Sequence, residues 1–405
     1  MSLMPVEHAL DIISKSFSHL EKEDIPLSEA MGRTTACDHV AALTQPPFNA
    51  SAMDGYALLA EDVANCPVEL TVIGEAPAGK SYDGEVQPGT TVRIFTGAPV
   101  PKGADTVIMQ ENTERLSEQT VRIVTGAQQG RNIRPAGNDF AKGQKLVDAG
   151  TVLTSRHIGM MAAANIATVT VTRKPRIALL STGDELVEVG LSVGPDQIIS
   201  SNNLLLSGLI TENGGTAVDL RIARDNTASL EEKITLLKTK DKIDLFITIG
   251  GASVGDHDLI QKVLGLHGLK VNFWKLAIRP GKPMIFGEFN NGPMIGLPGN
   301  PASAYVCAVN FMLPALHIML GRKTIGAPKS IAILAHELPA NATRQDYMRA
   351  HFTENSNGEK IISTTPRQDS AKLSTLSHAN CLLVRKPHAP AALKGERVEI
   401  LLLQP

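Results

Sequence analysis

Residues 177–186 read I-A-L-L-S-T-G-D-E-L, and this stretch decides the fold. Its first four residues form an uninterrupted apolar run, a pattern typical of a strand that is buried on both faces of a parallel sheet. The polar residues that follow are then predicted to form a loop at the carboxyl end of the strand, which is where open α/β sheets bind ligands. The stretch therefore predicts both a sheet and one wall of a binding site.

The sequence around this stretch continues the alternation of strands and helices. We expect strands at Ile177–Ser181, Ala217–Ile222, Leu245–Ile249, Met284–Gly287 and Pro293–Leu297, with helices at 202–211, 227–239, 259–264 and from Pro301 onward. The helix at 227–239 carries Leu230, Ile234 and Leu237 on one face, as a helix that covers a sheet should. Pro314 is expected to kink or break the last helix, because its ring clashes with the preceding turn. The region is predicted to be a mostly parallel sheet covered on both faces.

Outside this region the pattern of apolar residues changes. At 405 residues the chain is too long for one ordinary core. Short apolar runs separated by Pro- and Gly-containing turns predict a small β domain between about 46 and 140, and further such runs from Ser330 onward predict a second. A short amphipathic helix is expected at residues 5–17.

Composition excludes several classes of partner. Lys and Arg total 39 against 41 Asp and Glu, and aromatics make up 4%, so neither a basic field nor stacking platforms for nucleic acid are expected. No apolar stretch reaches the roughly 20 residues of a membrane helix, and the N-terminus does not resemble a signal peptide. We expect a soluble cytoplasmic protein.

Cysteine usage points to the same compartment. Four cysteines are scattered without Cys-x-x-Cys spacing, at Cys37, Cys66, Cys307 and Cys381. This argues against a zinc site or a disulfide framework and suits a reducing cytosol. Any metal should then have oxygen ligands, which favours magnesium over zinc.

The loop G-G-A-S-V-G-D-H-D at 250–258 has the residue types of a phosphate site. Gly250 and Gly251 allow backbone N–H groups to approach a phosphate closely, and Ser253 adds a hydroxyl donor. Asp256 brings a carboxylate to the same rim, and a phosphate beside a carboxylate invites a bridging magnesium ion. The simpler interpretation of the glycine pair alone is a tight turn after a strand.

The other two strand-end loops also have structural explanations. In L-P-G-N-P-A-S at 297–303, Asn300 suits the N-cap and Pro301 the first position of a helix. Asp184 and Glu185 are equally suited to the first turn of a helix. Their position at the end of a predicted strand is what indicates a role in binding or catalysis.

A basic segment, F-W-K-L-A-I-R-P-G-K-P at 273–283, is a candidate anion site. In an extended segment Lys275 and Arg279 share one face, so both could contact one anion, with Lys282 nearby. A solvated charged surface is the alternative. In the first β domain, Asp54, Thr96 and Asp139 are, taken singly, turn residues.

Taken together, these segments resemble the molybdopterin molybdenumtransferase family, the MoeA-like proteins that include the E domain of gephyrin. The matching motifs, in order, are P-P-F at 46–48, S-A-M-D-G-Y-A at 51–57, T-G-A-P-V-P at 96–101, G-A-D at 103–105, S-T-G-D-E-L at 181–186, G-G-A-S-V-G-D-H-D at 250–258, K-L-A-I-R-P-G-K-P at 275–283 and L-P-G-N-P-A-S at 297–303. Their order over essentially the whole chain makes a chance match implausible.

The resemblance implies a multidomain α/β plus β fold. Its parts are an elongated mixed domain from 1–45 with 141–173, a small β domain at 46–140, a three-layer, mostly parallel MogA-like α/β domain at 174–326 and a C-terminal β-barrel at 327–405. It also implies a homodimer whose site lies between the α/β domain of one subunit and the first β domain of the other. The implied reaction inserts molybdate into adenylylated molybdopterin and releases AMP, with Mg²⁺ as cofactor and other molybdenum-cofactor assembly proteins as partners.

Candidate residues follow from the motifs. The catalytic candidates are Asp54, Asp139, Glu185, Asp225 and Asp256, of which Glu185 and Asp256 are also the candidate metal ligands. The substrate-binding candidates are Thr96, Ser181, Thr182, Gly183, Asp184, Gly250, Gly251, Ser253, Lys275, Arg279, Lys282, Pro298, Gly299, Asn300, Pro301 and Ser303. Asp225 also suits a cap for the helix that follows it.

The sequence departs from the family pattern at a few positions. Asn49 and Ala50 replace an acid and an amide, Ala252 replaces a valine, and Asn138 replaces a glutamate beside Asp139. Arg279 stands for the usual lysine, which keeps the charge but exchanges a point donor for a planar fork. Two other functions stay open: a molybdopterin adenylyltransferase, and a scaffold without catalytic activity like the E domain of gephyrin.

Overall fold

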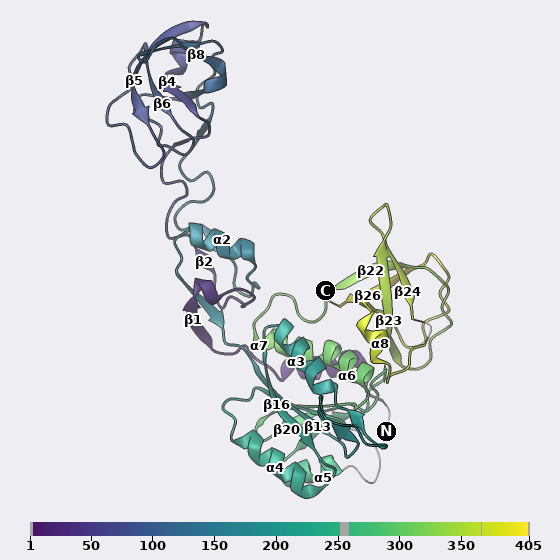
Figure 1. Ribbon diagram of the computed structural model, residues 1–405. Helices are drawn as coiled ribbons and strands as arrows, with labels where there is room; N and C mark the ends of the chain where they lie inside the picture. The colour runs from purple at the N-terminus through teal and green to yellow at the C-terminus, as the bar shows by residue number, and fades with distance from the viewer. Residues whose placement is uncertain (1–2, 252–258, 366, 404–405) are drawn as a thin grey trace.

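The computed structural model describes residues 3–251, 259–365 and 367–403. Figure 1 shows an elongated molecule, in which a slender arm carries the first β domain away from a broad body. The body contains the α/β sheet and the C-terminal β domain. The predicted multidomain α/β plus β fold class is confirmed.

The central sheet of the body has six strands. In spatial order they are β16 (Thr216–Ala223), β13 (Arg176–Thr182), β17 (Leu245–Ile249), β21 (Gly292–Leu297), β20 (Ile285–Phe289) and β18 (Lys270–Trp274). The first four run parallel, and β20 and β18 add an antiparallel edge. The carboxyl ends of β13, β17 and β21 therefore meet at one edge of the sheet, as the sequence predicts.

Helices cover both faces of this sheet. The helices are α3 (Asn202–Glu212), α4 (Thr227–Lys238), α5 (Leu259–Leu266), α6 (Pro301–Cys307) and α7 (Leu313–Met319). One core joins residues of α3, α6 and α7 to one face, and a second joins residues of α4 and α5 to the other. The α4 residues Leu230, Ile234 and Leu237 are all buried, which confirms the predicted face. The α/β domain thus has three layers.

The first helix, α1 (Val6–Lys15), belongs to the same core. Its apolar face, formed by Val6, Ala9 and Ile13, is buried together with residues of the sheet and of α7. The predicted division at residue 45 groups this helix with the elongated domain, whereas its packing groups it with the α/β domain. The reason is that burial of the apolar face requires a large core, which the slender arm does not have.

The last helix of the sheet contains the irregularity expected at Pro314. Between α6 and α7, residues Ala308–Met312 form a π-helix, immediately before the proline. A proline lacks an N–H and crowds the preceding turn, and the wider turn accommodates this defect without breaking the helix. Residues Pro301–Met319 are long and apolar enough to cross a membrane, but 89% of that stretch is buried inside the protein. This is the core helix of the fold.

The arm consists of the elongated domain and the first β domain. In the elongated domain β1 (Lys22–Pro26) pairs with β12 (Thr168–Thr172), β2 (His39–Val40) pairs with β11 (Lys145–Val147), and α2 (Ser155–Ala163) packs beside them. A short 3₁₀ helix, Leu27–Glu29, follows β1. The chain passes twice between the two domains, and the two passages touch through a bridge between Gln45 and Phe140.

The first β domain is built on a six-stranded sheet. Its strands, in spatial order, are β7 (Thr106–Met109), β4 (Gly55–Leu58), β6 (Thr90–Ile94), β5 (Val68–Ala76), β9 (Thr120–Ile123) and β8 (Thr113–Arg115). A two-stranded ribbon of β3 (Ala50–Ser51) and β10 (Ile133–Arg134) and two 3₁₀ turns, Ala60–Val63 and Gln110–Asn112, complete it. The apolar runs seen in the sequence are strands here.

The C-terminal β domain is a closed barrel. Its strands are β22 (Lys329–Leu334), β23 (Gln345–Glu354), β24 (Lys360–Thr364), β25 (Cys381–Arg385) and β26 (Arg397–Leu402), and pairing of β23 with both β24 and β25 closes the ring. Strand β19 (Ile278–Arg279) from the basic segment pairs with β23, and the helix α8 (Leu373–Ser377) packs against α6. The barrel is therefore joined to the α/β domain by backbone pairing.

A short ribbon of β14 (Leu186–Val187) and β15 (Ile198–Ile199) lies in the α/β domain.

An ion pair fixes the arm to the body. The Nη1 and Nη2 atoms of Arg173 donate to the Asp244 carboxylate at 2.9 and 2.8 Å, and the Arg176 N–H donates to the same carboxylate at 2.7 Å. We expect Asp244→Ala to lower the free energy of unfolding by about 2 kcal/mol, because it removes the bidentate partner of a largely buried guanidinium and leaves it only the exposed Glu21. Thermal unfolding of both proteins measures this. Asp241→Ala, an exposed neighbour, is the control, and equal losses from the two changes would contradict the role of the pair.

Candidate active site

A cleft of about 1190 Å³ lies at the carboxyl ends of β13, β17 and β21. The predicted site residues that line it are Ser181, Thr182, Gly183, Glu185, Asp225, Gly250, Gly251, Pro298, Gly299, Asn300 and Pro301. They come from all three strand-end loops and from the end of β16. The structure thus brings the three loops together at one edge of the sheet.

The first loop contains one hydroxyl group that is hydrogen-bonded within the protein and one that has no partner. The Ser181 hydroxyl donates to Oδ1 of Asn203 at 2.6 Å, and Asn203 in turn donates to Asp219, so this serine supports the loop from behind. The Thr182 Oγ1 atom is buried and has no hydrogen-bond partner. A buried hydroxyl without a partner is costly, so a ligand that reaches it is stabilised there.

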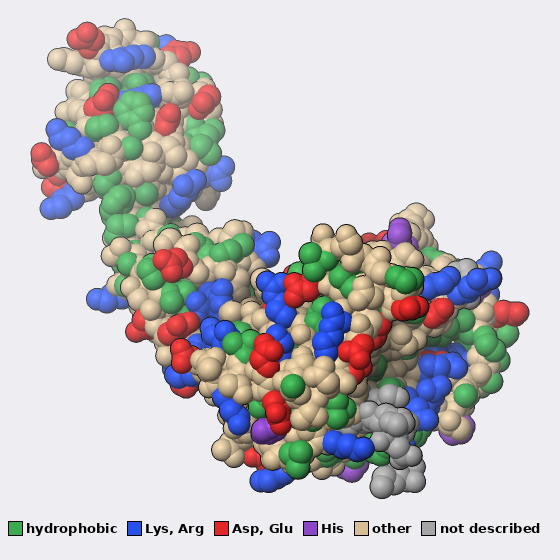
Figure 2. All heavy atoms as spheres, turned by 60° about the horizontal axis from the view of Figure 1, so that its bottom comes forward, with side chains coloured by type: hydrophobic (Ala, Val, Ile, Leu, Met, Phe, Trp, Pro, Cys, Tyr) green, Lys and Arg blue, Asp and Glu red, His purple; other side chains and the backbone are tan. Residues whose placement is uncertain are grey.

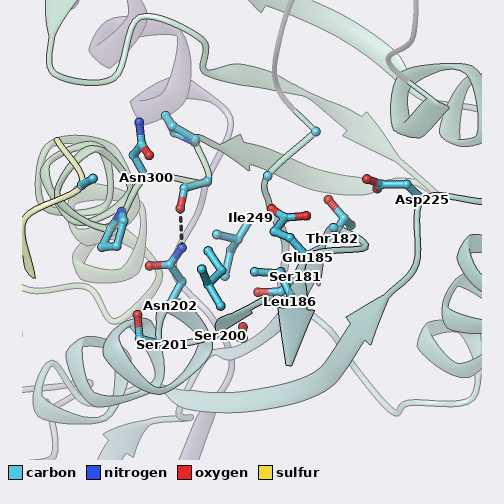
Figure 3. A pocket seen from close by; sticks show the side chains of 18 of the residues that line it. Ser181, Thr182, Glu185, Leu186, Ser200, Ser201, Asn202, Asp225, Ile249 and Asn300 are labelled. Atoms are coloured by element: carbon cyan, nitrogen blue, oxygen red, sulfur yellow. Dashed lines mark hydrogen bonds between the residues drawn. The ribbon is translucent and has the colours of Figure 1, made fainter. Parts of the chain in front are cut away.

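Three carboxylates gather at the end of this loop. Glu185 and Asp225 line the cleft, and Asp184 accepts a hydrogen bond from the Asp225 N–H at 3.0 Å. Figure 3 shows Glu185, Asp225 and Thr182 on one side of the cleft, opposite Asn202 and Asn300. The partial burial of the Asp225 carboxyl raises its pKa, and the charges of Asp184 and Glu185 raise it further. This side of the cleft is suited to a cation.

Arg224 holds the carboxylate loop in place. Its Nη1 atom donates to the backbone oxygens of Asp184 and Leu186, at 2.7 and 3.0 Å. Its positive charge is therefore directed to the backbone of the loop, whereas the carboxylates stay turned toward the cleft. Among the described lining residues, Lys262 is the single cation.

The glycines of the second loop are required by close packing. Gly250 has a φ of +93°, and a Cβ atom there would lie 2.7 Å from the Thr182 carbonyl oxygen. A Cβ atom at Gly299 would instead meet only the Gly250 Cα, at an ordinary 3.6 Å. The first and second loops thus touch through backbone alone, and the Gly250 N–H donates to the Leu297 carbonyl at 3.0 Å. Ser253 and Asp256 lie outside the described residues.

The third loop is held by polar side chains from two domains. The Asn202 amide donates to the Gly299 carbonyl at 2.7 Å, and the Asn300 amide donates to the Ser370 hydroxyl of the C-terminal barrel at 3.1 Å. Asn300 occupies the N-cap position of α6, but its side chain makes no capping bond. The Ser370 carbonyl instead accepts the Ala302 N–H at 3.0 Å. Ser303 is buried within α6 and does not line the cleft.

The basic segment is arranged differently from the expectation. It is not extended throughout, because Lys275 has a φ of +68° between β18 and β19. Lys275 lies over the Trp274 ring at 4.1 Å, and Arg279 forms an ion pair with the buried Asp346 of the barrel. The prediction that Lys275 and Arg279 share one face of an extended strand is therefore wrong. Lys282 is exposed beside Pro283, which lines the cleft.

A buried arginine of the barrel lies next to this region and is not indicated by the sequence. Arg349 on β23 is fully buried, and its Nη2 atom donates to the Asp369 carbonyl, next to the Ser370 loop that borders the cleft. Its Nε and Nη1 atoms have no partner. The sequence gives little indication of this strand, because β23 reads Q-D-Y-M-R-A-H-F-T-E and its polar residues interrupt the apolar pattern of a buried strand.

The site residues of the first β domain lie away from this cleft. Asp54 and Thr96 form a pair in which the Thr96 N–H and hydroxyl both donate to Oδ1 of Asp54, each at 2.7 Å. These bonds lower the pKa of Asp54, and the charge of Arg93 contributes to the decrease. Asp139 is exposed near the passage between the two arm domains. Figure 1 shows that the arm holds this domain far from the cleft of its own chain.

The cleft fits a phosphorylated ligand with a divalent cation. Its buried Thr182 Oγ1 and Asn202 Oδ1 atoms lack partners, and its carboxylates lie beside the Gly250–Gly251 loop. Within the described parts of the chain no group of three or more His, Cys, Asp or Glu forms a closed metal site. Mg²⁺ is usually held by one or two carboxylates together with water and phosphate oxygens, and Glu185 and Asp225 are the lining residues that could hold it.

Other features agree with the expected chemistry. The four cysteines are free thiols, and burial raises the pKa of both Cys307 and Cys381 to about 12. Figure 2 shows acidic and basic side chains intermixed over this face of the body.

Comparison with known proteins agrees with this architecture. Residues 4–165 match the family model of the MoeA N-terminal region (domain I and II), residues 178–318 that of a probable molybdopterin binding domain, and residues 332–403 that of the MoeA C-terminal region (domain IV). The three matches follow one another along the chain: the first covers the arm domains, the second the α/β domain and the third the C-terminal barrel. They define a multidomain α/β plus β protein of molybdenum-cofactor biosynthesis.

Individual relatives match along nearly the whole chain. A molybdopterin molybdenumtransferase of Haemophilus influenzae is 35% identical over 381 residues, which cover 94% of this chain and 93% of that protein. One from Bacillus subtilis is 30% identical over 409 residues, covering 99% and 94%. The crystal structure of a molybdopterin biosynthesis MoeA protein from Pyrococcus horikoshii superposes with a TM-score of 0.85, at 28% identity over 99% of this chain and 100% of that one. The chain belongs to the molybdopterin molybdenumtransferase family.

The carboxylate group makes a prediction about stability and pH. Because the folded-state pKa of Asp225 is raised, the ionised form destabilises the protein, and stability falls as the pH rises through that pKa. Asp225→Asn should therefore raise the melting temperature at neutral pH, and the gain should vanish well below the ordinary Asp pKa of about 3.9. Asp196→Asn, at an exposed position, is the control. A gain that persists at low pH would contradict the electrostatic cause.

Proposed function

We propose that this protein is a molybdopterin molybdenumtransferase, which inserts molybdate into adenylylated molybdopterin and releases AMP. The observation that carries the proposal is the cleft, in which three glycine-containing strand-end loops face a group of carboxylates. The names of the relatives support the same reaction. A transferase of this kind must hold a phosphate ester, admit an oxyanion and supply protons, and the residues present can meet each need.

The adenylate half of the substrate fits the glycine loops. The backbone N–H group of Gly251 would donate to a phosphate oxygen, and the Thr182 hydroxyl, which has no partner inside the protein, would reach the same group. Asn202 and Asn300 border the opposite wall and keep the third loop in position. Substrate phosphate would then lie between two rigid backbone segments.

Glu185 and Asp225 would hold Mg²⁺ beside this phosphate, with Asp256 assigned to the same role from the sequence. The ion would stabilise the negative charge that develops on the phosphate during cleavage. Asp184 fixes the backbone of Asp225 and so keeps this carboxylate at the rim. Glu185 is also the candidate for moving the protons that replacement of molybdenum oxo ligands by sulfur requires.

The basic segment remains our candidate for binding molybdate, with an altered arrangement. The segment contains three cationic residues, Lys275, Arg279 and Lys282, and is followed by Pro283, which lines the cleft. Of the three, Lys282 is exposed next to this proline. Arg279 is held by Asp346, so its guanidinium serves to dock the segment on the barrel as well as to provide charge. Lys275, stacked on Trp274, keeps its ammonium group at a defined place.

The first β domain completes the site in a homodimer. Its Asp54 and Thr96 form a pre-arranged pair but lie far from the cleft of their own chain (Figure 1). A second copy of the chain can bring them to the cleft, because the arm projects from the body. Asp139, at the base of the same domain, is assigned to this second half. We place the protein in the cytoplasm, in contact with other cofactor-assembly proteins.

The two alternative functions account for fewer features. An adenylyltransferase needs a nucleotide cleft but gives no role to the arm or to the Asp54 pair, and the relatives carry the name of the molybdenum-inserting enzyme. A scaffold without catalytic activity needs neither the carboxylate group nor the close glycine packing. Conversion of molybdopterin and ATP by the purified protein would favour the adenylyltransferase.

Glu185→Gln tests the central role of the cleft. The variant should keep the melting temperature of the wild type and lose molybdenum insertion by about a hundredfold or more, because the carboxylate can no longer take up or release a proton. Insertion is measured with purified protein, adenylylated molybdopterin and molybdate. Glu188→Gln, which alters a nearby carboxylate paired with Arg221, should retain activity. Full activity of the Glu185 variant would refute its assignment.

A mixture of two inactive variants tests the shared site. If Asp54 of one subunit serves the cleft of the other, a heterodimer of Asp54→Asn and Glu185→Gln contains one site without either change. Random exchange of subunits should then restore about a quarter of wild-type activity, since half of the dimers are mixed and each has one intact site. Mixing should restore nothing if both residues act within one chain.

A further inference from the structure

A second hollow, of about 730 Å³, lies on the open face of the first β domain. Its lining includes Tyr56, Ile73, Glu75, Arg93, Phe95 and Gln110, which come from β4, β5, β6 and the turns beside them. We call it the Arg93 groove. None of the site residues predicted from the sequence lines it, and its mixture of aromatic and charged side chains is unlike an ordinary surface depression.

Arg93 is held rigidly at the centre of this groove. Its guanidinium carbon lies 5.0 Å from the centroid of the Tyr56 ring and 5.2 Å from that of Phe95. Its Nη2 atom also donates to Oε1 of Gln110 at 2.7 Å. Two aromatic contacts and one hydrogen bond fix the plane of the guanidinium, so little side-chain entropy is lost when a ligand binds it.

A carboxylate stands beside this guanidinium. Glu75 on β5 is the register partner of Arg93 on β6, and side chains of paired residues emerge on the same face of a sheet. Among the described residues no ion pair joins the two, and Glu75 is exposed. A positive and a negative group thus border the groove side by side, and each is available to a ligand.

The groove is connected to the Asp54 pair through backbone contacts of two lining residues. The Gln110 N–H donates to the Asp54 carbonyl at 3.0 Å, and Phe95 directly precedes Thr96, whose N–H and hydroxyl hold the Asp54 carboxylate. The Arg93 charge also contributes to the lowered pKa of Asp54. A ligand in the groove would therefore lie beside the segments that hold the side chain proposed to complete the active site.

The aromatic, carboxylate and guanidinium groups of the groove together match one class of flat heteroaromatic ring. An apolar wall and ring edges suit a flat heteroaromatic ligand, the carboxylate suits adjacent amino and ring N–H donors, and the guanidinium suits a carbonyl oxygen or ring nitrogen. A 2-amino-4-oxopteridine presents both kinds of edge. Adenine presents an amino group and ring acceptors but no adjacent pair of donors for the carboxylate.

We propose that the Arg93 groove binds the pterin ring of the substrate, with Glu75 and Arg93 determining its specificity. The inference rests on the proposed function for the identity of the substrate. It adds a division of labour: the first β domain of one subunit holds the pterin, and the α/β cleft of the other holds the adenylate. The dithiolene sulfurs, which lie between these two parts of the substrate, would then be presented near Asp54 and Glu185.

Binding of pterin-6-carboxylate to the full-length protein tests the proposal, with the fluorescence anisotropy of the pterin as the readout. Glu75→Gln should weaken binding by about tenfold or more, because it removes a charged acceptor for the ring donors. Arg93→Lys should weaken it similarly, because a lysine lacks the planar fork. Glu61→Gln, on the same domain but outside the groove, is the matched control and should bind as the wild type does. Melting temperatures verify that each variant is folded.

Competition identifies the ligand class. AMP should not displace the pterin, and AMP binding should be unaffected by Glu75→Gln. The proposal is overturned if the wild type does not bind the pterin, if Glu75→Gln binds it as tightly, or if inorganic phosphate displaces it, since the groove would then be an oxyanion site. Molybdenum insertion is measured separately: pterin binding without insertion would leave the groove in place and refute the proposed function, and insertion without pterin binding would do the reverse.

Discussion

The contact between the Thr182 carbonyl and Gly250 is the constraint on which the site depends. The two backbones approach so closely that a side chain at Gly250 would overlap the carbonyl oxygen. This proximity follows from the parallel register of β13 and β17, whose carboxyl ends stop at the same level. The Thr182 hydroxyl stays available beside this contact, and the carboxylates of Glu185 and Asp225 are carried to the rim. The cleft is thus a consequence of strand register and of one residue without a side chain.

Much of this could be predicted from the sequence, because strand and helix periodicity is strong in the α/β region. The strand Leu245–Ile249 and the buried face of α4 agree with their predictions, since local apolar patterns determine them. Three features could not be predicted. Strand β23 carries polar residues buried between domains, the left-handed backbone at Lys275 has no sequence signature, and α1 packs on a core assembled from residues far along the chain. Each depends on tertiary contacts that local patterns do not encode.

The two β domains contribute to function in different ways. The barrel is joined to the α/β domain through the pairing of β19 with β23, through the Arg279–Asp346 ion pair and through the Ser370 contacts at the start of α6. These bonds make it a fixed wall of the cleft. Within the described residues no strand pairing or ion pair joins the first β domain to the body of its own chain, and this domain carries two sets of ordered polar groups, the Asp54 pair and the Arg93 groove. In the proposed homodimer these groups would serve the cleft of the other subunit.

The two passages of chain between the arm domains bear on how such a shared site works. They meet at the bridge between Gln45 and Phe140, so the first β domain is attached by a pair of adjoining connections. A single connection would permit the domain to swivel about its own axis, whereas a paired one permits bending and resists rotation. In the proposed homodimer the domain would consequently approach or withdraw from the neighbouring cleft while presenting the same face throughout. Opening for substrate entry and closing for reaction would then be one hinge motion that preserves the alignment of the two halves.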